Sequence, residues 1–437
     1  MSGLRQPPST LTLLDRSGSA AREGEVDVTE PQLEIISPEY YETHGYPHET
    51  WTWLRRHDPI RRWDLPNFRP FWSVVRHADV FAISRDPYRF QNAPRLGVFP
   101  ADTEDVNNPP LRHLINMDPP EHQTYRGLVS RRFTPRALER LRPTTEAVVA
   151  ELLHDLRDRE EIDFVPEFSA IVPLAVIADL LGVPRENWRT LFRWTNEIIA
   201  PADPEFSQGA DGAATMETFQ RAIQQMFDYF TALVERRTKE PRDDIASTLA
   251  AARVDGQPIP AFELMSYFVL LIVAGNETTR NAITGGLRAL MDNRGELAKL
   301  QRDPAGMARP AAEEIVRWTS PVIQFCRTTT EDVELHGTTI PAGENLCLFY
   351  PSANRDESVF DDPFAFRIDR EPNPHLGFGV GEHVCLGAHL ARLELQVVMT
   401  RLAERVERIE PVGELQRARS SFVGGIKHMP IRWKLRE

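Results

Sequence analysis

The sequence predicts a mainly α-helical protein with a small β region. A long, apolar helical pattern covers about residues 260–293, and further helical patterns cover residues 136–160 and much of 164–240. β-type segments are short, such as the aromatic and β-branched run 71–75 and the apolar run 346–349. Long helices combined with brief strands indicate a helical domain that carries a small sheet.

Size and composition limit the classes of protein to consider. The chain has 437 residues, and its 41% apolar content is enough for a large core. A net charge of −13 argues against nucleic acid or an anionic membrane surface as a partner. The cysteines are Cys326, Cys347 and Cys385, which form no disulfide framework and fit a reducing cytoplasm.

The N-terminus is polar, and we expect residues 1–34 to be a flexible tail ahead of one domain over 35–437. The tail has no apolar core of signal-peptide length. The most apolar run, 268–274, is too short to span a bilayer. We therefore expect no membrane anchor and a cytoplasmic location.

The first third of the chain alternates helical and irregular segments. Residues 38–57 predict an opening amphipathic helix, and residues 71–75 predict a strand. Residues 91–115 are rich in Pro, Asn and Asp and predict a long loop, which in a compact domain is usually functional.

The segment 117–126 predicts a helix start with two basic side chains. Asp118 can cap a helix that begins at the two following prolines. His122 and Arg126 are four residues apart, so they lie on one helix face. By itself this spacing is typical of a solvated charged face.

Helical patterns between 164 and 240 are interrupted twice. The first break is at 182–184, and the second lies between Pro201 and Gly212. The second break has several Pro and Gly residues and predicts a flexible connection.

The long helix contains a polar interruption at Ala274-Gly275-Asn276-Glu277-Thr278-Thr279. Gly costs about 1 kcal/mol against Ala in a helix, and such a break in a buried helix is typical of a functional site. The Thr278 hydroxyl can bond back to the carbonyl of Ala274 and leave space beside Gly275. Glu277 and Thr278 can then form a proton path. A simple kink with a surface Glu is the alternative.

Further along, Glu314 and Arg317 are three residues apart on one predicted helix face. The following segment, 320–327, is extended and apolar. A Gly-Gly pair at 424–425 predicts the tip of a hairpin near the C-terminus.

The segment Phe378–Gly387 places Cys385 in a Gly-rich turn before an apolar helix. Glycines two apart permit a tight turn, and a helix N-terminus stabilises a thiolate. Such a thiolate suits haem iron. A buried, unreactive cysteine is one alternative. A zinc site with His383, Cys385 and His389 is another, but it lacks a further ligand at suitable spacing.

These motifs, in this order, resemble the cytochrome P450 family over about residue 35 to the end. The ligand loop matches Phe-Gly-x-Gly-x-His-x-Cys-x-Gly at every diagnostic position. The resemblance implies the P450 fold, a single helical domain with haem b between the oxygen-activation helix and the cysteine loop. It implies Cys385 as iron ligand and propionate contacts from His122, Arg126, Arg327 and His383. The remaining haem-contact residues implied are Ala274, Gly275, Phe378, Gly379 and Gly387.

The resemblance also assigns roles to the other motifs. Glu277 and Thr278 correspond to an acid–alcohol pair that delivers protons. Glu314 and Arg317 correspond to a structural lock whose third member is Arg370, with Arg367 possible. The 91–115 loop and the 201–212 break correspond to segments that cover the pocket. The substrate-facing residues implied are Val322, Ile323, Phe325, Phe422 and Val423.

The implied reaction is insertion of one oxygen atom of O2 into a C–H bond, with electrons from a separate ferredoxin and its reductase. Arg392, Arg131 and Arg132 could form a basic face for the donor, or could be scattered arginines. The motif sequences look most like bacterial hydroxylases of sterol side chains and methyl-branched lipids, and we expect a steroid- or terpenoid-sized substrate. Alternatives are alkyl aromatics, fatty or branched lipids, or a non-catalytic haem protein that binds a ligand.

Overall fold

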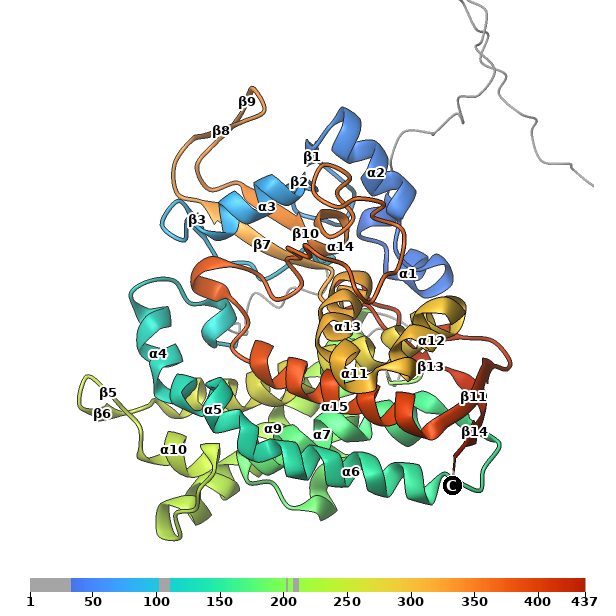
Figure 1. Cartoon of the computed structure of the whole chain (residues 1–437). Coiled ribbons are helices and arrows are strands. Elements are labelled where there is room, and N and C mark those ends of the chain that lie inside the picture. Colours follow the sequence, from blue (N-terminus) through green and yellow to red (C-terminus); the bar gives the residue numbers. More distant parts are fainter. Residues whose placement is uncertain (1–32, 102–110, 202, 207–211, 437) are drawn as a thin grey trace, which may run out of the picture. The chain divides into compact units, whose positions relative to one another are not determined.

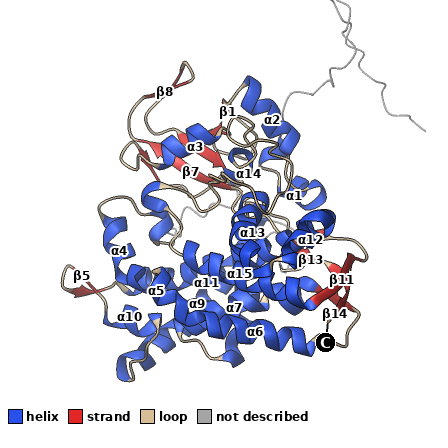
Figure 2. Ribbon diagram, in the orientation of Figure 1, coloured by secondary structure: helices blue, strands red, loops and turns tan. Residues whose placement is uncertain are grey.

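Helices predominate in the computed structural model, as the sequence predicts (Figures 1 and 2). The structure describes residues 33–101, 111–201, 203–206 and 212–436. Nearly all of the expected tail over residues 1–34 lies outside the described residues. So do parts of the expected loop 91–115 and of the second break.

The α-helices have the following bounds: α1 Pro38–His44, α2 His48–His57, α3 His77–Ser84, α4 Glu121–Ser130, α5 Pro135–Leu138, α6 Arg142–Asp155, α7 Ile171–Leu181, α8 Trp188–Ile199, α9 Gly212–Lys239, α10 Ile245–Ala251, α11 Ala261–Asp292, α12 Arg294–Arg302, α13 Pro304–Thr319, α14 Tyr350–Ala353 and α15 Ala388–Arg405. Shorter 3-10 or π turns lie at Leu33–Ile35, Leu114–Asn116, Arg131–Phe133, Glu139–Leu141, Val165–Ser169, Arg185–Asn187 and Gly381–His383.

The strands form one larger sheet and several small ones. The larger sheet has the order β1-β2-β10-β7-β3, and a second sheet has the order β11-β14-β4. Two-stranded pairs are β5-β6, β8-β9 and β12-β13. Their bounds are β1 Ile60–Trp63, β2 Phe71–Val74, β3 Phe90–Gln91, β4 Glu161–Asp163, β5 Arg253–Val254, β6 Gln257–Pro258, β7 Gln324–Thr329, β8 Val333–Leu335, β9 Thr338–Ile340, β10 Asn345–Phe349, β11 Val406–Pro411, β12 Gln416–Arg417, β13 Ile426–His428 and β14 Pro430–Leu435.

Helix α11 is the centre of the helical part and contacts α7, α8, α9, α13 and α15. By length and composition it is the one helix among the described residues that is apolar enough to cross a membrane, and 56% of its most apolar window is buried. A buried central helix meets the same criterion, because its apolar side chains pack on all sides.

Two hydrophobic cores meet along α11. Its N-terminal part, 264–272, belongs to the core shared with α7 and α9. Its C-terminal part, 282–291, belongs to the core shared with α13 and α15. None of the residues 273–281 is a fully buried member of either core. The polar interruption therefore lies between the two hydrophobic cores.

Two local expectations were wrong. The single opening helix over 38–57 is two helices, because Gly45 leaves α1 with a φ of 79° and Pro47 precedes α2. Asp118 does not cap α4 with its side chain. Its carboxylate instead accepts the backbone N–H groups of Asn92 (2.7 Å) and Ala93 (3.1 Å), and so ties the preceding loop to the helix start.

Candidate active site

A cavity of about 220 Å³ lies beside the middle of α11 and the start of α15. Its wall includes Thr278 and every residue that was expected to contact haem. Those residues are His122, Arg126, Ala274, Gly275, Arg327, Phe378, Gly379, His383, Cys385 and Gly387. Segments from α4, α11, β7 and the cysteine loop, far apart in the sequence, therefore form one site.

The cysteine loop has its shape because of two glycines in the left-handed region. Gly379 has a φ of 66° and Gly381 a φ of 78°. A Cβ on Gly381 would lie 2.5 Å from the carbonyl oxygen of Ser84, so a side chain cannot fit there. The N–H of Cys385 donates to the carbonyl of Phe378 (2.8 Å) and closes the loop. The turn predicted from the glycine spacing is present.

The thiol of Cys385 has accessible surface, and that surface faces the cavity. Protein surrounds the rest of the side chain, and this burial raises the pKa of the thiol. A hydrogen bond from the backbone of Gly387, just before α15, opposes the shift. A metal ion bound to the sulfur would remove the proton outright.

One end of the cavity is basic. The rings of His122 and His383 lie 4.1 Å apart, and Arg126 and Arg327 share the same wall. The His122 Nδ1 atom is 2.8 Å from a carboxylate oxygen of Glu382. Burial, with the neighbouring basic groups, lowers the pKa of His383 to about 2. Its buried Nε2 atom has no hydrogen-bond partner among the described residues.

These residues fit haem b. The sulfur of Cys385 would bind the haem iron, and Ala274 and Gly275 add small residues of α11 to the cavity wall. At the basic end, the unpartnered Nε2 of His383 and the two guanidinium groups match the need of two propionates for donors.

The helix interruption has the hydrogen bond that the sequence predicts. The Thr278 hydroxyl donates to the carbonyl of Ala274 (2.9 Å) and lines the cavity. Gly275 also lines the cavity, and its lack of a side chain additionally allows α11 to pack closely against α7. A Cβ there would lie 3.0 Å from Ile177 of α7.

Glu277 does not line the cavity. Its carboxylate is 1% exposed and forms an ion pair with Arg280 at the interface between α11 and α8. Burial raises the pKa of Glu277, and Arg280 opposes the shift. Arg280 in turn donates to Asn196 of α8 (2.9 Å). The two members of the expected acid–alcohol pair therefore point to different surroundings.

Sequence reasoning missed Arg280 and Asn196. The spacing of three residues between Glu277 and Arg280 was an available signal, because such residues are neighbours on a helix. Asn196 lies 84 residues from Arg280, and no local pattern connects them.

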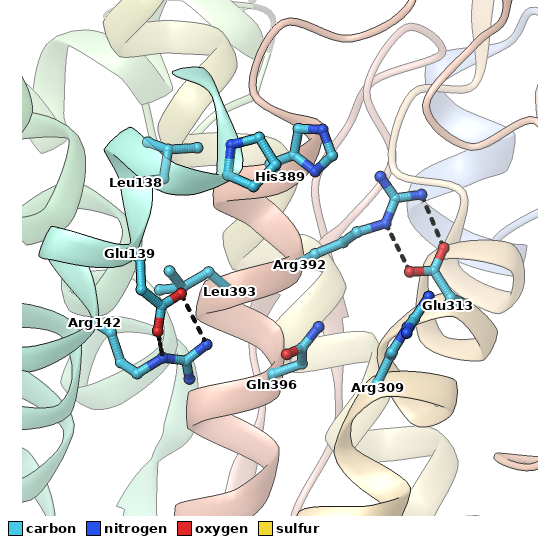
Figure 3. Close-up of a pocket in the computed structure, with 10 residues that line it drawn as sticks. Leu138, Glu139, Arg142, Arg309, Glu313, His389, Arg392, Leu393 and Gln396 are labelled. Carbon is cyan, nitrogen blue, oxygen red and sulfur yellow. Dashed lines mark hydrogen bonds and ion pairs between the residues drawn. The ribbon is translucent and has the colours of Figure 1, made fainter. Parts of the chain in front are cut away.

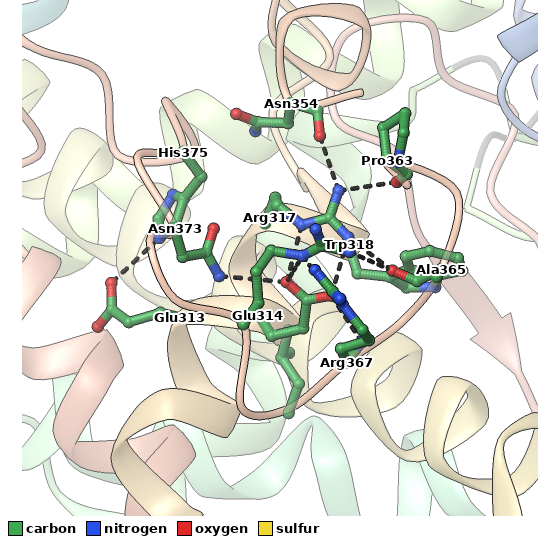
Figure 4. A network of polar contacts seen from close by, with 12 residues as sticks. Glu313, Glu314, Arg317, Trp318, Asn354, Pro363, Ala365, Arg367, Asn373 and His375 are labelled. Carbon is green, nitrogen blue, oxygen red and sulfur yellow. Dashed lines mark hydrogen bonds and ion pairs between the residues drawn. The ribbon is translucent and has the colours of Figure 1, made fainter. Parts of the chain in front are cut away.

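The Glu314 network holds the chain ahead of the cysteine loop (Figure 4). Arg317 donates to both carboxylate oxygens of Glu314 (2.7 and 2.8 Å), and both side chains are fully buried. The Nε atom of Arg370 lies 3.2 Å from the same carboxylate. Arg367 contributes its backbone N–H (2.9 Å). Arg317 also donates to the carbonyls of Asn354 and Pro363.

The residues expected to face substrate divide into two groups. Val322 and Phe325 line the cavity. Ile323 does not; it is fully buried in the core around Trp51, because neighbours in an extended segment point to opposite sides.

Phe422 and Val423, the expected hairpin residues, contact Phe325 and Val322 but do not themselves line the cavity. The ring of Phe422 lies 5.6 Å from that of Phe325, and Val423 pairs with Val322 in an isolated β-bridge. Neither is among the cavity-lining residues.

A groove of about 520 Å³ lies along α15, lined from α5, α6, α13 and α15 (Figure 3). Arg392 lies in this groove, and its guanidinium group donates hydrogen bonds to both carboxylate oxygens of Glu313 (2.6 and 2.9 Å). Arg131 and Arg132 do not line the groove, and Arg132 pairs with Asp243. The groove therefore contains Arg392 but not Arg131 or Arg132, so these three arginines do not line one common groove.

Comparisons with known proteins agree with this geometry. The sequence model of the family described as Cytochrome P450 matches residues 307–415. A "Methyl-branched lipid omega-hydroxylase" of Mycobacterium bovis is 40% identical over 391 residues, which cover 87% of this chain and 89% of that protein. A "Steroid C26-monooxygenase" of Mycolicibacterium smegmatis is 39% identical, covering 86% and 88%. Among solved structures, cytochrome P450 CYP268A2 of Mycobacterium marinum, in complex with pseudoionone, matches with a TM-score of 0.84 and 31% identity over 94% of this chain and 100% of that one.

Proposed function

The chain belongs to the cytochrome P450 family, and on this premise we propose that it hydroxylates a C–H bond of a hydrophobic molecule of steroid or terpenoid size. The chain is a haem-thiolate monooxygenase, with O2 as co-substrate. Haem, when bound, supplies the activation of oxygen. The substrate and its electron donors are the proposed part.

The residues of the cavity would hold the cofactor and shape the reaction. Cys385 would ligate the iron, and the basic end would orient the propionates. The Thr278 hydroxyl donates its hydrogen to the Ala274 carbonyl, so its oxygen could accept a hydrogen bond from a water molecule in the cavity and help to pass a proton.

The observation that carries the substrate proposal is the apolar wall formed by Val322 and Phe325. Burial of apolar surface favours a hydrophobic substrate. The named steroid monooxygenase supports the steroid class. The similarity to a lipid hydroxylase supports a methyl-branched or fatty lipid as the second candidate, and an alkyl aromatic is a third.

The test is a visible-absorption titration of the purified ferric protein with a sterol, a monoterpene, a methyl-branched fatty acid and an alkylbenzene. A low- to high-spin shift with the sterol or the monoterpene would support the proposal. A shift with the fatty acid or the alkylbenzene alone would overturn it. Phe325→Ala should weaken binding, by roughly tenfold if most of the ring is buried on binding. The matched control is Ile323→Val, whose side chain does not line the cavity.

We further propose that electrons come from a separate, acidic ferredoxin and its reductase, in the cytoplasm. The groove beside α15 contains Arg309, which has no ion-pair partner among the described residues, and His389. Arg309→Glu should therefore slow reduction by such a ferredoxin, and added salt should slow reduction of the wild type. An unchanged rate in both experiments would contradict this docking site.

The sequence alone left open a non-catalytic haem protein that binds a ligand. The relatives named as a hydroxylase and a monooxygenase argue against this alternative. The Thr278 hydroxyl in the cavity wall also argues against it, because a protein that only binds a ligand would not need that group. Substrate-dependent product formation with a ferredoxin, its reductase and NADH would demonstrate the activity directly.

A further inference from the structure

Two of the three cysteines face each other across neighbouring strands of the larger sheet. Cys326 of β7 and Cys347 of β10 are directly opposite in the antiparallel register. Both side chains are buried, with 1% and 0% exposure, and both belong to the core around Trp51, so they lie on the same face of the sheet. Neither lines the cavity, where Cys385 is the cysteine.

The backbone hydrogen bonds show which kind of antiparallel pair the two cysteines form. The N–H of Thr329 in β7 donates to the carbonyl of Glu344 (3.1 Å), so this is a hydrogen-bonded pair. Hydrogen-bonded and non-hydrogen-bonded pairs alternate along an antiparallel ladder. Cys326 is three residues before Thr329, so its pair with Cys347 is a non-hydrogen-bonded one. The N–H of Cys326 accordingly donates away from β10, to the carbonyl of Leu96 (2.9 Å).

This kind of pair has the spacing that a disulfide needs. The Cα atoms of a non-hydrogen-bonded pair are about 4.5 Å apart, and disulfides join residues with Cα atoms about 4.4–6.8 Å apart. The two sulfurs also interact, because burial and then a hydrogen bond with Cys326 raise the pKa of Cys347. The two strands therefore hold the thiols in position to react with each other.

Neighbouring amide side chains give the two sulfurs different roles. The Cys347 thiol donates to the side-chain oxygen of Gln324 (2.8 Å), which favours the protonated form. The Cys326 Sγ atom instead accepts a hydrogen bond from the side-chain nitrogen of Asn345 (3.4 Å), which favours a thiolate. Because the thiolate is the reactive form of cysteine, Cys326 is the attacking sulfur and Cys347 the resolving one.

We propose that hydrogen peroxide converts Cys326 and Cys347 into a disulfide that joins β7 to β10. A monooxygenase produces this oxidant when O2 takes up two electrons and two protons without transfer of oxygen to substrate. The Cys326 sulfur breaks the O–O bond and becomes a sulfenic acid, with release of one water. Cys347 then attacks that sulfur, the S–S bond forms and a second water leaves. The two thiols together lose two electrons and two protons, which reduce one peroxide to two waters.

Burial makes this pair selective for a small oxidant. Thiol–disulfide exchange requires access of the partner thiol to a sulfur atom, and both sulfurs lie in the core. Peroxide is close to water in size, whereas glutathione is a tripeptide. The disulfide would therefore form with peroxide and then be reduced only slowly, even in a reducing cytoplasm.

The disulfide would act on the cavity through β7. Phe325 and Arg327, on either side of Cys326, both line the cavity. The Arg327 guanidinium also donates to the carbonyl of Cys326 (2.7 Å). A disulfide holds the two Cβ atoms about 3.8 Å apart, which is closer than the roughly 4.5–5.5 Å between opposite Cβ atoms in a sheet. Strand β7 must therefore shift, and the two side chains in the cavity wall shift with it.

The first test maps the disulfide in the full-length protein with haem bound. After treatment with dilute hydrogen peroxide and unfolding, maleimide labelling should fall from three thiols to one. Digestion and mass spectrometry should recover a linked pair of peptides that contain Cys326 and Cys347. Oxidised glutathione in place of peroxide should leave all three thiols free.

The second test measures the effect of the disulfide on the cavity. Phenylimidazole, whose ring nitrogen ligates haem iron, is titrated by visible absorption before and after peroxide treatment. Binding to the wild type should weaken after treatment, by up to about tenfold if contact with Phe325 is lost. Cys347→Ala and Cys326→Ala should show no such weakening. All three proteins receive the same peroxide, so direct damage to the haem is common to them.

Three mapping results would overturn the proposal: both cysteines remain thiols after peroxide, Cys326 becomes a sulfinic acid without a linked peptide, or the link involves Cys385. Disulfide formation with oxidised glutathione would overturn the selectivity for a small oxidant. Equal weakening in the wild type and in Cys347→Ala would overturn the effect on the cavity. Failure to find a substrate would concern only the proposed function, since neither test uses a substrate or an electron donor.

Discussion

Glu277 and Arg280, one turn apart on α11, form an ion pair in which the side chains are 1% and 4% exposed. The pair faces α8 rather than the cavity, and Asn196 of α8 accepts a hydrogen bond from the arginine. Removing one member would leave the other buried without a counter-charge, which is far more costly than losing an exposed pair. The relationship ties the position of α8 to the middle of α11.

Arg280→Met should therefore destabilise the protein by about 3–5 kcal/mol. The matched control is Arg288→Met on the same helix, which removes an exposed pair with Asp292 (2.7 Å) and should cost about 1 kcal/mol or less. Denaturant unfolding of both variants measures the difference. An equal loss of unfolding free energy in the two variants would show that the buried ion pair contributes no more to stability than the exposed one.

Cys385→Ser should fold but lose the spectrum of a thiolate-ligated haem, because serine does not replace the sulfur ligand. The readout is haem content together with the Soret band of the reduced carbonyl complex. Cys326→Ala is the control, since Cys326 is buried in the sheet and does not line the cavity. A normal spectrum in Cys385→Ser would refute the assignment of the ligand.

Glu314→Gln should leave Arg317 and Arg370 buried without a carboxylate, at a cost of about 3–5 kcal/mol. Because this network anchors the chain before the cysteine loop, haem uptake should fall together with stability. Glu404→Gln, at an exposed pair with Arg401, is the control. Haem retention equal to the control at normal yield would contradict the role of the lock.

His428 lies between two carboxylates near the end of the chain. Its Nδ1 atom meets Asp163, and its Nε2 atom is 3.1 Å from Glu205. Burial alone would lower its pKa, but hydrogen bonds to Asp163 and Glu205 outweigh burial and raise the pKa above 6.5. Lys427, which pairs with Asp203 (2.7 Å) and Glu205 (3.5 Å), is the nearby cation.

A raised histidine pKa contributes stability that is complete below pH 6.5 and is lost as the pH rises through the folded-state pKa. The difference in thermal midpoint between wild type and His428→Gln should accordingly be largest near about pH 6 and shrink toward about pH 9. His44→Gln, at an exposed histidine, should show no such trend. A difference that is constant with pH would rule out this contribution.

Much of the fold and site could be predicted, because the informative residues lie within short segments. The turn at Gly379 and Gly381 and the Thr278–Ala274 hydrogen bond follow from residues at most four apart. The helical class follows from long patterns such as α11.

The rest depended on directions and distant contacts that spacing does not encode. The side of α11 to which Glu277 points is set by Asn196 and Arg280 together. Which of Val322 and Ile323 faces the cavity depends on strand register, which a one-residue shift reverses. Glu394 of α15 is buried and lines the cavity. It carried no local signal, because a glutamate in an amphipathic helix normally faces solvent.

Helix α15 contributes residues such as Glu394 to the cavity wall and residues such as Arg392 to the groove, and this arrangement restricts how the length of the chain can vary. Inserting one residue between Gly387 and Leu390 would turn the rest of the helix by about 100° relative to Cys385. Arg392 would then leave the groove, and Glu394 would leave the cavity wall. Lineages of this chain should therefore tolerate insertions at the exposed β8–β9 turn, His336–Gly337, but keep the number of residues from Cys385 to Glu394 fixed.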